Sequence, residues 1–192
     1  MPQIILASTS PYRRELLARF GLPFECVAPD VDETPHPDEP PESLVRRLAE
    51  SKARSVAVRY PDALVIGSDQ VAVLGDTIIG KPLDHARATT QLRAVSGRRI
   101  TFLNGLCLIN TASDQVQISV VPFNVFFRVL SDEMIERYLI REKPYNCAGS
   151  LRSEALGIVL CDRLEGDDPN ALIGLPLIQL ARMLEAAGVA IL

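Results

Sequence analysis

The chain has 192 residues, a formal net charge of −4 at pH 7, 47% hydrophobic residues and 23% charged residues. This balance is typical of a globular protein, and we expect residues 1–192 to form a single domain. The acidic charge and the lack of a basic run argue against a nucleic-acid polymer as partner. Because the chain has no apolar run of membrane-spanning length and no signal-peptide pattern, we expect a cytoplasmic protein without a membrane partner.

Cysteine and histidine content narrows the chemistry. The cysteines are widely spaced and form no C-x-x-C pair, which argues against a zinc site or a disulfide framework. The chain has two histidines: His36 lies in a proline-rich segment and His85 lies at a predicted helix start. A catalytic triad based on histidine is therefore not favoured. Any chemistry should therefore depend on carboxylates, lysines and arginines.

The first predicted elements are a strand and a helix. The apolar run at residues 4–7 predicts a buried strand. Ser10 is a good helix N-cap and Pro11 suits the first helical position, so a helix is expected from residue 11 to 20. Gly21 is a typical C-terminal stop for that helix.

This strand-to-helix turn predicts a phosphate site. A helix N-terminus favours anions, and Ser8 and Ser10 add hydroxyl groups there. Arg13 or Arg14 can supply a guanidinium fork that matches phosphate geometry. The turn is not a P-loop, and an ordinary capped helix with two surface arginines is the alternative interpretation.

Apolar periodicity and turn residues predict the remaining elements. The next helices are expected at residues 41–60, 84–95, 131–141 and 176–187. Further strands are expected at residues 24–28, 63–68, 71–74, 77–79, 99–110, 115–129 and 157–161. Helices and strands alternate, and the two predicted hairpins require antiparallel pairs. We therefore expect an α/β fold with a mixed sheet flanked by helices.

Several charged residues are placed where predicted elements end. Asp69 follows the apolar strand predicted at residues 63–68, a position that faces the ligand crevice in open α/β sheets. Glu33 lies in an acidic loop, Lys52 lies beside the apolar stripe of its helix, and Lys81 precedes a proline. Each has an ordinary alternative: a turn cap, a solvated charge, a snorkelling lysine and a plain turn residue.

Together with an arginine of the first helix, these residues suit a metal-bound triphosphate. Mg²⁺ takes one or two carboxylates along with phosphate oxygens and water. Lysine and arginine neutralise the oxygens that gain charge during phosphate cleavage. A carboxylate near the metal can orient or deprotonate the attacking water, so the reaction requires no histidine.

A series of short motifs runs along the chain in a fixed order. They are Ser8-x-Ser10-Pro11-x-Arg13-Arg14, Val31-Asp32-Glu33, Lys52-Ala53, Gly67-Ser68-Asp69-Gln70, Gly80-Lys81-Pro82, Cys147-Ala148-Gly149-Ser150 and Asn170-x-x-x-Gly174-Leu175-Pro176. In content and order they resemble the Maf family of nucleoside triphosphate pyrophosphatases, from Ile4 to the last predicted helix. Within the family, the chain is similar to the YceF branch, the 7-methyl-GTP pyrophosphatases.

The resemblance implies an elongated ITPase-like α/β fold, with a twisted mixed sheet and two lobes around a central cleft. It implies a nucleoside triphosphate as partner, Mg²⁺ or Mn²⁺ as cofactor, and cleavage between the α- and β-phosphates. Asp69 matches the proton acceptor, and Glu33 and Asp69 match the metal ligands. The phosphate-binding positions are matched by Ser8, Ser10, Arg13, Lys52 and Lys81. The positions that set base choice are matched by Tyr12, Gln70 and Glu154.

The specificity residues also have a physical interpretation. The ring of 7-methylguanine is positively charged, so the aromatic face of Tyr12 would attract it. Glu154 can accept hydrogen bonds from the base, and Gln70 can offer both a donor and an acceptor. Tyr12 replaces a frequent Trp of the branch, and Ala155 replaces a Gly that commonly follows the Glu. If that Gly needs a positive φ, Ala155 would change the direction of Glu154.

Three other functions stay open at this point. The first is a pyrophosphatase for dTTP or UTP, and the second is a nucleotide-binding regulator of cell division. The third is a nucleotidyltransferase, which is disfavoured because the chain has no glycine-rich nucleotide loop. The sequence also leaves open whether the protein is a monomer or a homodimer.

Overall fold

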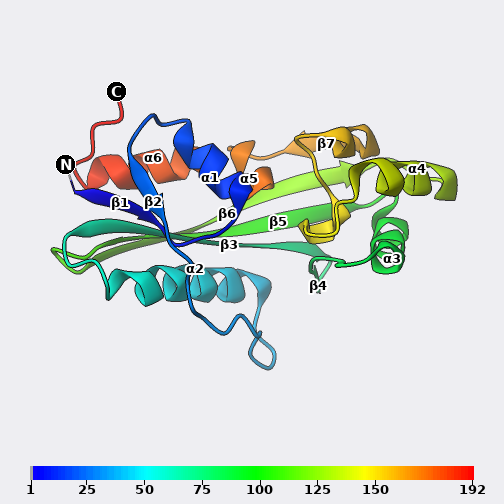
Figure 1. The fold of residues 1–192 in the computed structure, drawn as a ribbon. Coiled ribbons are helices and arrows are strands. Elements are labelled where there is room, and N and C mark those ends of the chain that lie inside the picture. Colours follow the sequence, from blue (N-terminus) through cyan, green and yellow to red (C-terminus); the bar gives the residue numbers. More distant parts are fainter. Residues whose placement is uncertain (1) are drawn as a thin grey trace. The chain divides into compact units, whose positions relative to one another are not determined.

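A computed structural model describes residues 2–192, which form an α/β fold with a mixed sheet (Figure 1). Within these residues there are seven strands: β1 (Gln3–Leu6), β2 (Phe24–Cys26), β3 (Ala63–Leu74), β4 (Thr77–Ile79), β5 (Arg99–Asn110), β6 (Gln115–Phe127) and β7 (Cys161–Glu165). The α-helices are α1 (Pro11–Ala18), α2 (Pro41–Ala57), α3 (His85–Val95), α4 (Asp132–Glu142), α5 (Asn170–Ile173) and α6 (Leu177–Ala186). Two short 3₁₀ helices follow α4: η1 (Ala148–Ser150) and η2 (Leu156–Leu160). None of the helices within residues 2–192 is both long and apolar enough to cross a membrane.

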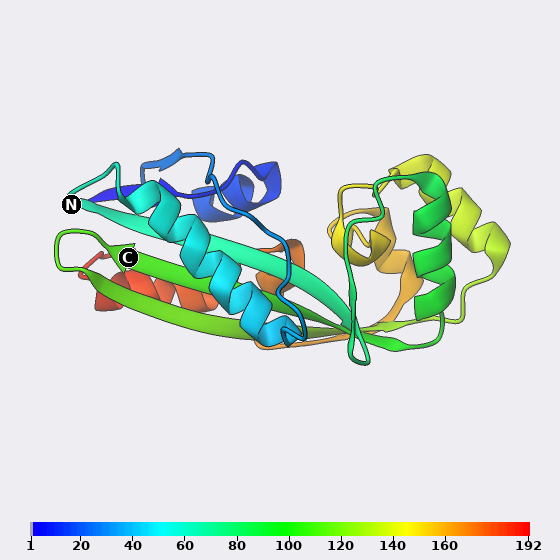
Figure 2. The ribbon, with the colours of Figure 1, turned by 90° about the horizontal axis from the view of Figure 1, so that it is seen from below.

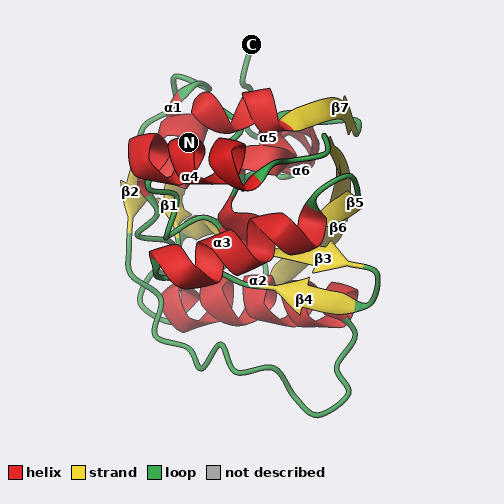
Figure 3. Ribbon diagram, turned by 90° about the vertical axis from the view of Figure 1, so that its right-hand side faces the viewer, coloured by secondary structure: helices red, strands yellow, loops and turns green. Residues whose placement is uncertain are grey.

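The sheet has the strand order β2-β1-β3-β5-β6-β7, and β4 pairs with β3 outside that path. Strand β1 runs parallel to β2 and β3, whereas the β3–β4 and β6–β7 pairs are antiparallel. Strands β3 and β4 form a hairpin (Figure 3). The hairpin turns at Gly75, whose φ of 61° is the left-handed conformation that glycine adopts easily. The predicted mixed sheet is therefore confirmed.

The chain divides into two compact units, which we describe separately. Unit 1 comprises Met1–Gln70, Asn104–Val121 and Asp168–Leu192, and unit 2 comprises Val71–Leu103 and Pro122–Asp167. Strands β3, β5 and β6 each contribute residues to both units. The elongated shape and the central cleft that the family resemblance implies stay predictions.

In unit 1 the sheet is covered by helices on both faces. Figures 1 and 2 show α2 crossing one face, while α1 and α6 cover the other. Side chains of β1 alternate accordingly, because successive residues of a strand point to opposite faces. Ile4 and Leu6 join the core cluster that contains Leu16 of α1 and Leu180 of α6. Ile5 belongs to the second cluster, which contains residues of α2.

Two glycines allow α2 to lie very close to the sheet. A Cβ atom on Gly67 of β3 would overlap the backbone oxygen of Ala49, and one on Gly105 of β5 would overlap that of Val45. Neither residue needs a special φ, so the requirement here is space. This close approach brings one face of α2 against β3, where Lys52 lies.

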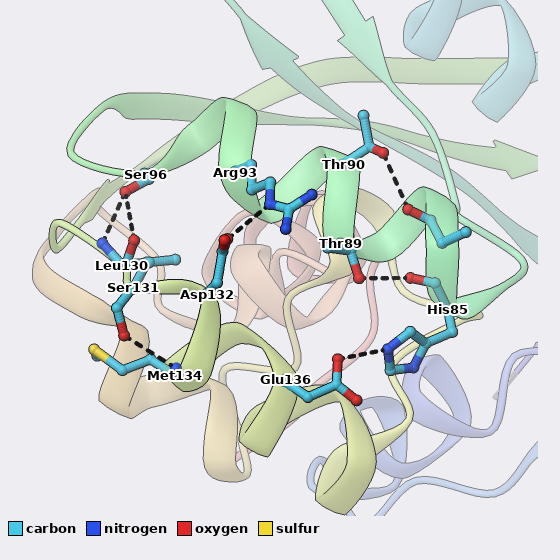
Figure 4. Close-up of polar contacts among 11 residues, drawn as sticks. His85, Thr89, Thr90, Arg93, Ser96, Leu130, Ser131, Asp132, Met134 and Glu136 are labelled. Atoms are coloured by element: carbon cyan, nitrogen blue, oxygen red, sulfur yellow. Dashed lines mark hydrogen bonds and ion pairs between the residues drawn. The ribbon is translucent and has the colours of Figure 1, made fainter.

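Unit 2 is organised around the α3–α4 pair, whose polar contacts are shown in Figure 4. Arg93 of α3 pairs with Asp132 of α4 at 2.7 Å, and His85 contacts Glu136 at 2.9 Å. At one end of the pair, the backbone N–H of Leu130 donates to Ser96 Oγ over 2.7 Å. Leu92 of α3 and Ile135 and Leu139 of α4 are buried.

The prediction of a strand at residues 157–161 is wrong. Residues 157–160 belong to η2, and β7 starts only at Cys161. The β-branched residues Ile158 and Val159 favour a strand, but they are about half exposed and pair with no neighbouring strand. Instead, the N–H of Gly157 donates to Arg152 O, which closes a local turn. Local backbone hydrogen bonding thus overrides the β propensity of this segment.

Candidate functional site

Three charged residues of unit 1 meet at one ammonium group. Lys52 Nζ lies 2.7 Å from Asp69 Oδ1 and 2.8 Å from Glu33 Oε1. The side chains of Lys52 and Asp69 are only 7% and 9% exposed, whereas that of Glu33 is 60% exposed. The structure therefore brings together three of the predicted site residues from a loop, a helix and a strand.

Asp69 was expected to follow the end of a strand, but it lies inside one. Strand β3 continues without a break from Ala63 to Leu74, and Asp69 and Gln70 lie within it. Aspartate disfavours strands, but here its carboxylate is paired with Lys52, so the local preference is overridden. Because side chains alternate, Asp69 shares the α2 face of β3 with Gly67, while Ser68 and Gln70 point to the opposite face.

The turn before α1 holds both predicted phosphate-binding serines. The N–H of Ser10 donates to Ser8 Oγ over 3.1 Å, and the N–H of Arg13 donates to Ser10 Oγ over 3.4 Å. Ser10 is therefore the N-cap of α1, as predicted. A hydroxyl that accepts in this way still carries a hydrogen that it can donate to an anion.

The two arginines of α1 have different positions. Arg13 is half-buried, and its Nε donates to Gly174 O over 2.9 Å. Burial lowers the pKa of the Arg13 guanidinium, and the negative charges of Asp69 and Glu33 oppose that shift. Arg14 instead lines a pocket of about 400 Å³ beside the turn, together with Ser8 and other residues. Of the two, Arg13 is thus the arginine whose pKa is affected by the charges of Asp69 and Glu33.

On its other face, β3 contacts the segment around α5. Gln70 Nε2 donates to Ala171 O and Leu172 O over 2.9 and 3.2 Å. Ser68 is fully buried, and its Oγ donates to Gly174 O over 3.2 Å. These carbonyl groups were not predicted from the sequence. The only signal for them was the Asn170-x-x-x-Gly174-Leu175-Pro176 motif, whose backbone, not its side chains, makes these contacts.

Lys81 and Glu154, the two remaining charged candidates, belong to unit 2. Lys81 is exposed and lies next to Gly80, whose carbonyl accepts from Gln91 Nε2 over 3.1 Å. Glu154 Oε1 accepts from Arg152 Nε over 3.2 Å. Their relation to the unit 1 cluster stays a prediction. Tyr12 lies half-buried on α1, in unit 1.

Ala155 does not strain the backbone next to Glu154. Its φ is −131°, which is outside the left-handed region that favours glycine. The N–H of Ala155 donates to Arg152 O over 3.3 Å. Ala155 therefore gives no backbone reason for Glu154 to point in another direction.

The carboxylates of the site fit a metal ion that binds together with substrate phosphates. Within residues 2–192, no three His, Cys, Asp or Glu side chains form a metal-binding group. Mg²⁺ needs only one or two carboxylates when phosphate oxygens and water complete its coordination. Asp69 and Glu33 both reach Lys52 Nζ, which shows that a single cation can engage both carboxylates.

Comparison with known proteins gives three findings. The family model described as "Maf-like protein" matches residues 3–187. A 7-methyl-GTP pyrophosphatase from Nitrosococcus oceani is 61% identical over 191 residues, which cover 100% of this chain and 96% of that protein. The structure of the Staphylococcus aureus Ham1 protein matches with a TM-score of 0.45 and 12% identity, over 65% of this chain and 71% of that chain.

Proposed function

Since the chain belongs to the Maf family, we propose that it hydrolyses the α–β phosphoanhydride of 7-methyl-GTP, releasing 7-methyl-GMP and pyrophosphate. The observation that carries the proposal is the convergence of Asp69, Glu33 and Lys52 on one point. The full-length relative named 7-methyl-GTP pyrophosphatase supports the choice of substrate. A free nucleotide as substrate also agrees with the expected cytoplasmic location.

Asp69 is the base in this proposal. Lys52 holds its Oδ1, so Oδ2 is the oxygen that we assign to the attacking water. The proton of that water passes to Oδ2 as the water oxygen bonds to the α-phosphorus, and the bond to the bridging oxygen breaks to release pyrophosphate. A divalent cation, held by Asp69 and Glu33, would supply charge neutralisation at the phosphate oxygens.

The cationic and hydroxyl groups stabilise the charge that leaves with pyrophosphate. Arg13 is fixed through Nε on Gly174 O, so its terminal nitrogens are the donors that we assign to phosphate oxygens. Ser8 and Ser10 add hydroxyl donors from the turn before α1. Lys81 is the second lysine of the proposed phosphate site, and it carries a compact positive charge.

The positive charge of the 7-methylguanine ring provides a basis for substrate recognition. Methylation at N7 makes the guanine ring cationic, and an aromatic face attracts such a ring by about 0.5–2 kcal/mol. We assign that face to Tyr12 and the hydrogen-bonding contacts to Gln70 and Glu154. A Tyr12→Trp variant should lower KM for 7-methyl-GTP relative to GTP, because Trp gives the stronger cation–π contact.

The catalytic assignment is tested by Asp69→Asn. We expect the rate of pyrophosphate release to fall by roughly 10²–10⁴-fold, with nucleotide binding retained in a calorimetric titration. The matched control is Asp76→Asn in the exposed β3–β4 turn, which should keep full turnover. Unchanged turnover in Asp69→Asn would contradict the proposal.

The substrate assignment is tested by a panel of triphosphates assayed with Mg²⁺, with Mn²⁺ and with a chelator. The highest kcat/KM is expected for 7-methyl-GTP, and the chelator should abolish turnover. If UTP or dTTP is turned over as well as 7-methyl-GTP, the base assignment is wrong. If nucleotides bind without any turnover, the regulator alternative replaces the enzyme.

A further inference from the structure

Asp168 is a buried carboxylate that the proposed mechanism does not use. Asp168 as a whole is only 2% exposed. Oδ1 accepts from both the backbone N–H and the side-chain Nδ2 of Asn170, each over 2.9 Å. Oδ2 accepts from the N–H of Ile178, in the first turn of α6, over 2.7 Å. One carboxylate therefore joins the start of α5 to the start of α6.

The segment held by Asp168 carries the carbonyl groups that bind two site residues. Ala171 O and Leu172 O accept from Gln70, and Gly174 O accepts from Arg13. Helix α5 has only four residues, too few to be stable through its own hydrogen bonds. Its position therefore depends on ties such as those made by Asp168.

These contacts determine what Gln70 can offer a ligand. The side-chain amide has two N–H donors and one carbonyl acceptor. Because two backbone carbonyls bind Nε2, the remaining group is Oε1, which only accepts hydrogen bonds. A base facing Gln70 must then present a donor. Guanine does so at N1–H and at its 2-amino group. Adenine carries its only donor of this edge on the 6-amino group, where guanine has the acceptor O6, and it presents an acceptor at N1.

We propose that Asp168 is a positioning residue that sets base selectivity: by fixing the α5 segment it holds the Gln70 amide in its acceptor-only orientation. This inference rests on the proposed function, since it concerns the base that the same site reads. A carboxylate is required because three N–H donors converge on its two oxygens. An asparagine would place an NH₂ group against at least one of these donors, which loosens the segment.

The kinetic test uses Asp168→Asn, with the neighbouring, exposed Asp167→Asn as matched control. We expect the ratio of kcat/KM for 7-methyl-GTP to kcat/KM for ATP to fall by roughly 5–50-fold in Asp168→Asn. The control should leave the ratio unchanged. In a Gln70→Ala background, Asp168→Asn should no longer change the ratio. An equal loss for both nucleotides, or the same fall without Gln70, would overturn the proposal.

A second test does not depend on activity. The side-chain NH₂ signals of Gln70 can be assigned in a ¹⁵N–¹H spectrum by their loss in Gln70→Ala. In the parent protein we expect both hydrogens to be protected from solvent exchange, and in Asp168→Asn we expect them to lose this protection. Unchanged protection would contradict the role of Asp168 even if the enzyme is active. If no triphosphate is hydrolysed, the proposed function fails. The exchange measurement still tests whether Asp168 holds the Gln70 amide in place.

If Asp168→Asn does not fold, Asn170→Ala provides the milder change, because it removes one of the three donors. It also removes the bond from Arg19 Nη1 to Asn170 Oδ1, so Arg19→Ala serves as its control. We expect a smaller fall of the selectivity ratio in Asn170→Ala than in Asp168→Asn, and none in Arg19→Ala. No change in Asn170→Ala would count against the proposal.

Discussion

Lys52 Nζ and Asp69 Oδ1 are 2.7 Å apart, and both side chains are almost completely buried. Removing two charges from water costs more free energy than a single ion pair in a protein interior usually returns. A pair in such a place is therefore weak evidence for a role in stability. A buried pair of charges is instead expected in an active site, where the charges act on a substrate.

This burial predicts an asymmetric response to substitution. Lys52→Met leaves the carboxylate of Asp69 buried without its main partner, so we expect the free energy of unfolding at pH 7 to fall by about 3–5 kcal/mol. The double variant Lys52→Met with Asp69→Leu replaces both charges by apolar groups and should recover most of that loss. Urea denaturation of the three proteins measures both effects.

An exposed ion pair on the same helix is the control. Arg54 Nη2 and Glu50 Oε1 also lie 2.7 Å apart, but the two side chains are 52% and 32% exposed. Such surface pairs contribute about 0–1 kcal/mol, so Arg54→Met should have little effect. If Lys52→Met costs no more than Arg54→Met, the interpretation of the buried pair is wrong.

Local signals in the sequence predicted the helix starts well. Ser10, Asp84 and Ser131 each cap a helix by accepting a backbone N–H three residues later, as their residue types indicate. Lys52 was also correctly placed beside the apolar stripe of α2, and it is buried. These features depend on residues a few positions apart, which a single sequence displays directly.

Contacts between distant segments were not predictable in the same way. Arg13 and Gly174 are 161 residues apart in the chain, and Gln70 and Ala171 are 101 apart. Their partners are backbone carbonyls, which every residue has, so no residue type marks them. Asp69 was expected to follow the strand because the apolar run ends just before it, yet its partner Lys52 keeps it within β3.

The close approach of α2 to the sheet gives a second prediction. A Cβ on Gly67 would overlap backbone atoms of Ala49 and Ala53, so Gly67→Ala must push α2 away from β3. We expect a loss of about 1–3 kcal/mol in unfolding free energy and a lower kcat, because Lys52 moves with α2. Thermal unfolding and a pyrophosphate assay measure the two effects.

Gly80→Ala is the stability control for this change. A Cβ on Gly80 meets no atom within 4 Å, and its φ is not positive. Its melting temperature should therefore stay close to that of the parent protein. If Gly67→Ala is equally harmless, α2 has more freedom to move than the packing indicates.

The buried thiol of Cys107 provides a prediction about pH. Burial raises the pKa of this thiol to about 12. At pH 8 only about one thiol in 10⁴ is then ionised, and the thiolate is the reactive form. We expect Ellman's reagent to leave Cys107 unmodified in the folded protein at pH 8 and to modify it in urea.

The same shift affects stability in alkaline solution. Because the folded-state pKa lies above the unfolded value, the contribution of the protonated thiol is complete below pH 9 and disappears as pH rises towards 12. Cys107→Ala should therefore lose less stability than the parent protein between these pH values. The exposed Cys26 is the control, since Cys26→Ser should lower rapid labelling in the native state by one thiol. Rapid native labelling that persists in Cys26→Ser and disappears in Cys107→Ala would contradict the prediction.

In unit 2, Gln91 holds the backbone next to Lys81. Its Nε2 donates to Gly80 O over 3.1 Å, and its Oε1 accepts from Ser150 Oγ over 2.6 Å. Ser150 is fully buried with a φ of 56°, a costly conformation for a residue other than glycine, which persists only where surrounding contacts hold it. One side-chain amide therefore ties a strained turn to the loop that carries Lys81.

Gln91→Leu should remove both contacts at little change in volume. If Lys81 binds the phosphates as proposed, we expect kcat/KM to fall by roughly 3–30-fold, because the loop that carries Lys81 is then held less firmly. In a double-mutant cycle with Lys81→Ala, the two effects should be clearly less than additive, since Gln91 acts through Lys81. Steady-state kinetics of the four proteins measure the coupling.

Gln117→Leu separates this role from a general loss of a glutamine contact. Gln117 Nε2 donates to Met183 O over 3.0 Å in unit 1, so the variant removes a comparable bond to a backbone carbonyl. Its effect should be on stability, with kcat/KM close to that of the parent and no coupling to Lys81→Ala. If Gln91→Leu behaves like Gln117→Leu, Gln91 contributes only to folding. If it lowers kcat/KM equally with and without Lys81, it acts on the site by some route other than the lysine loop.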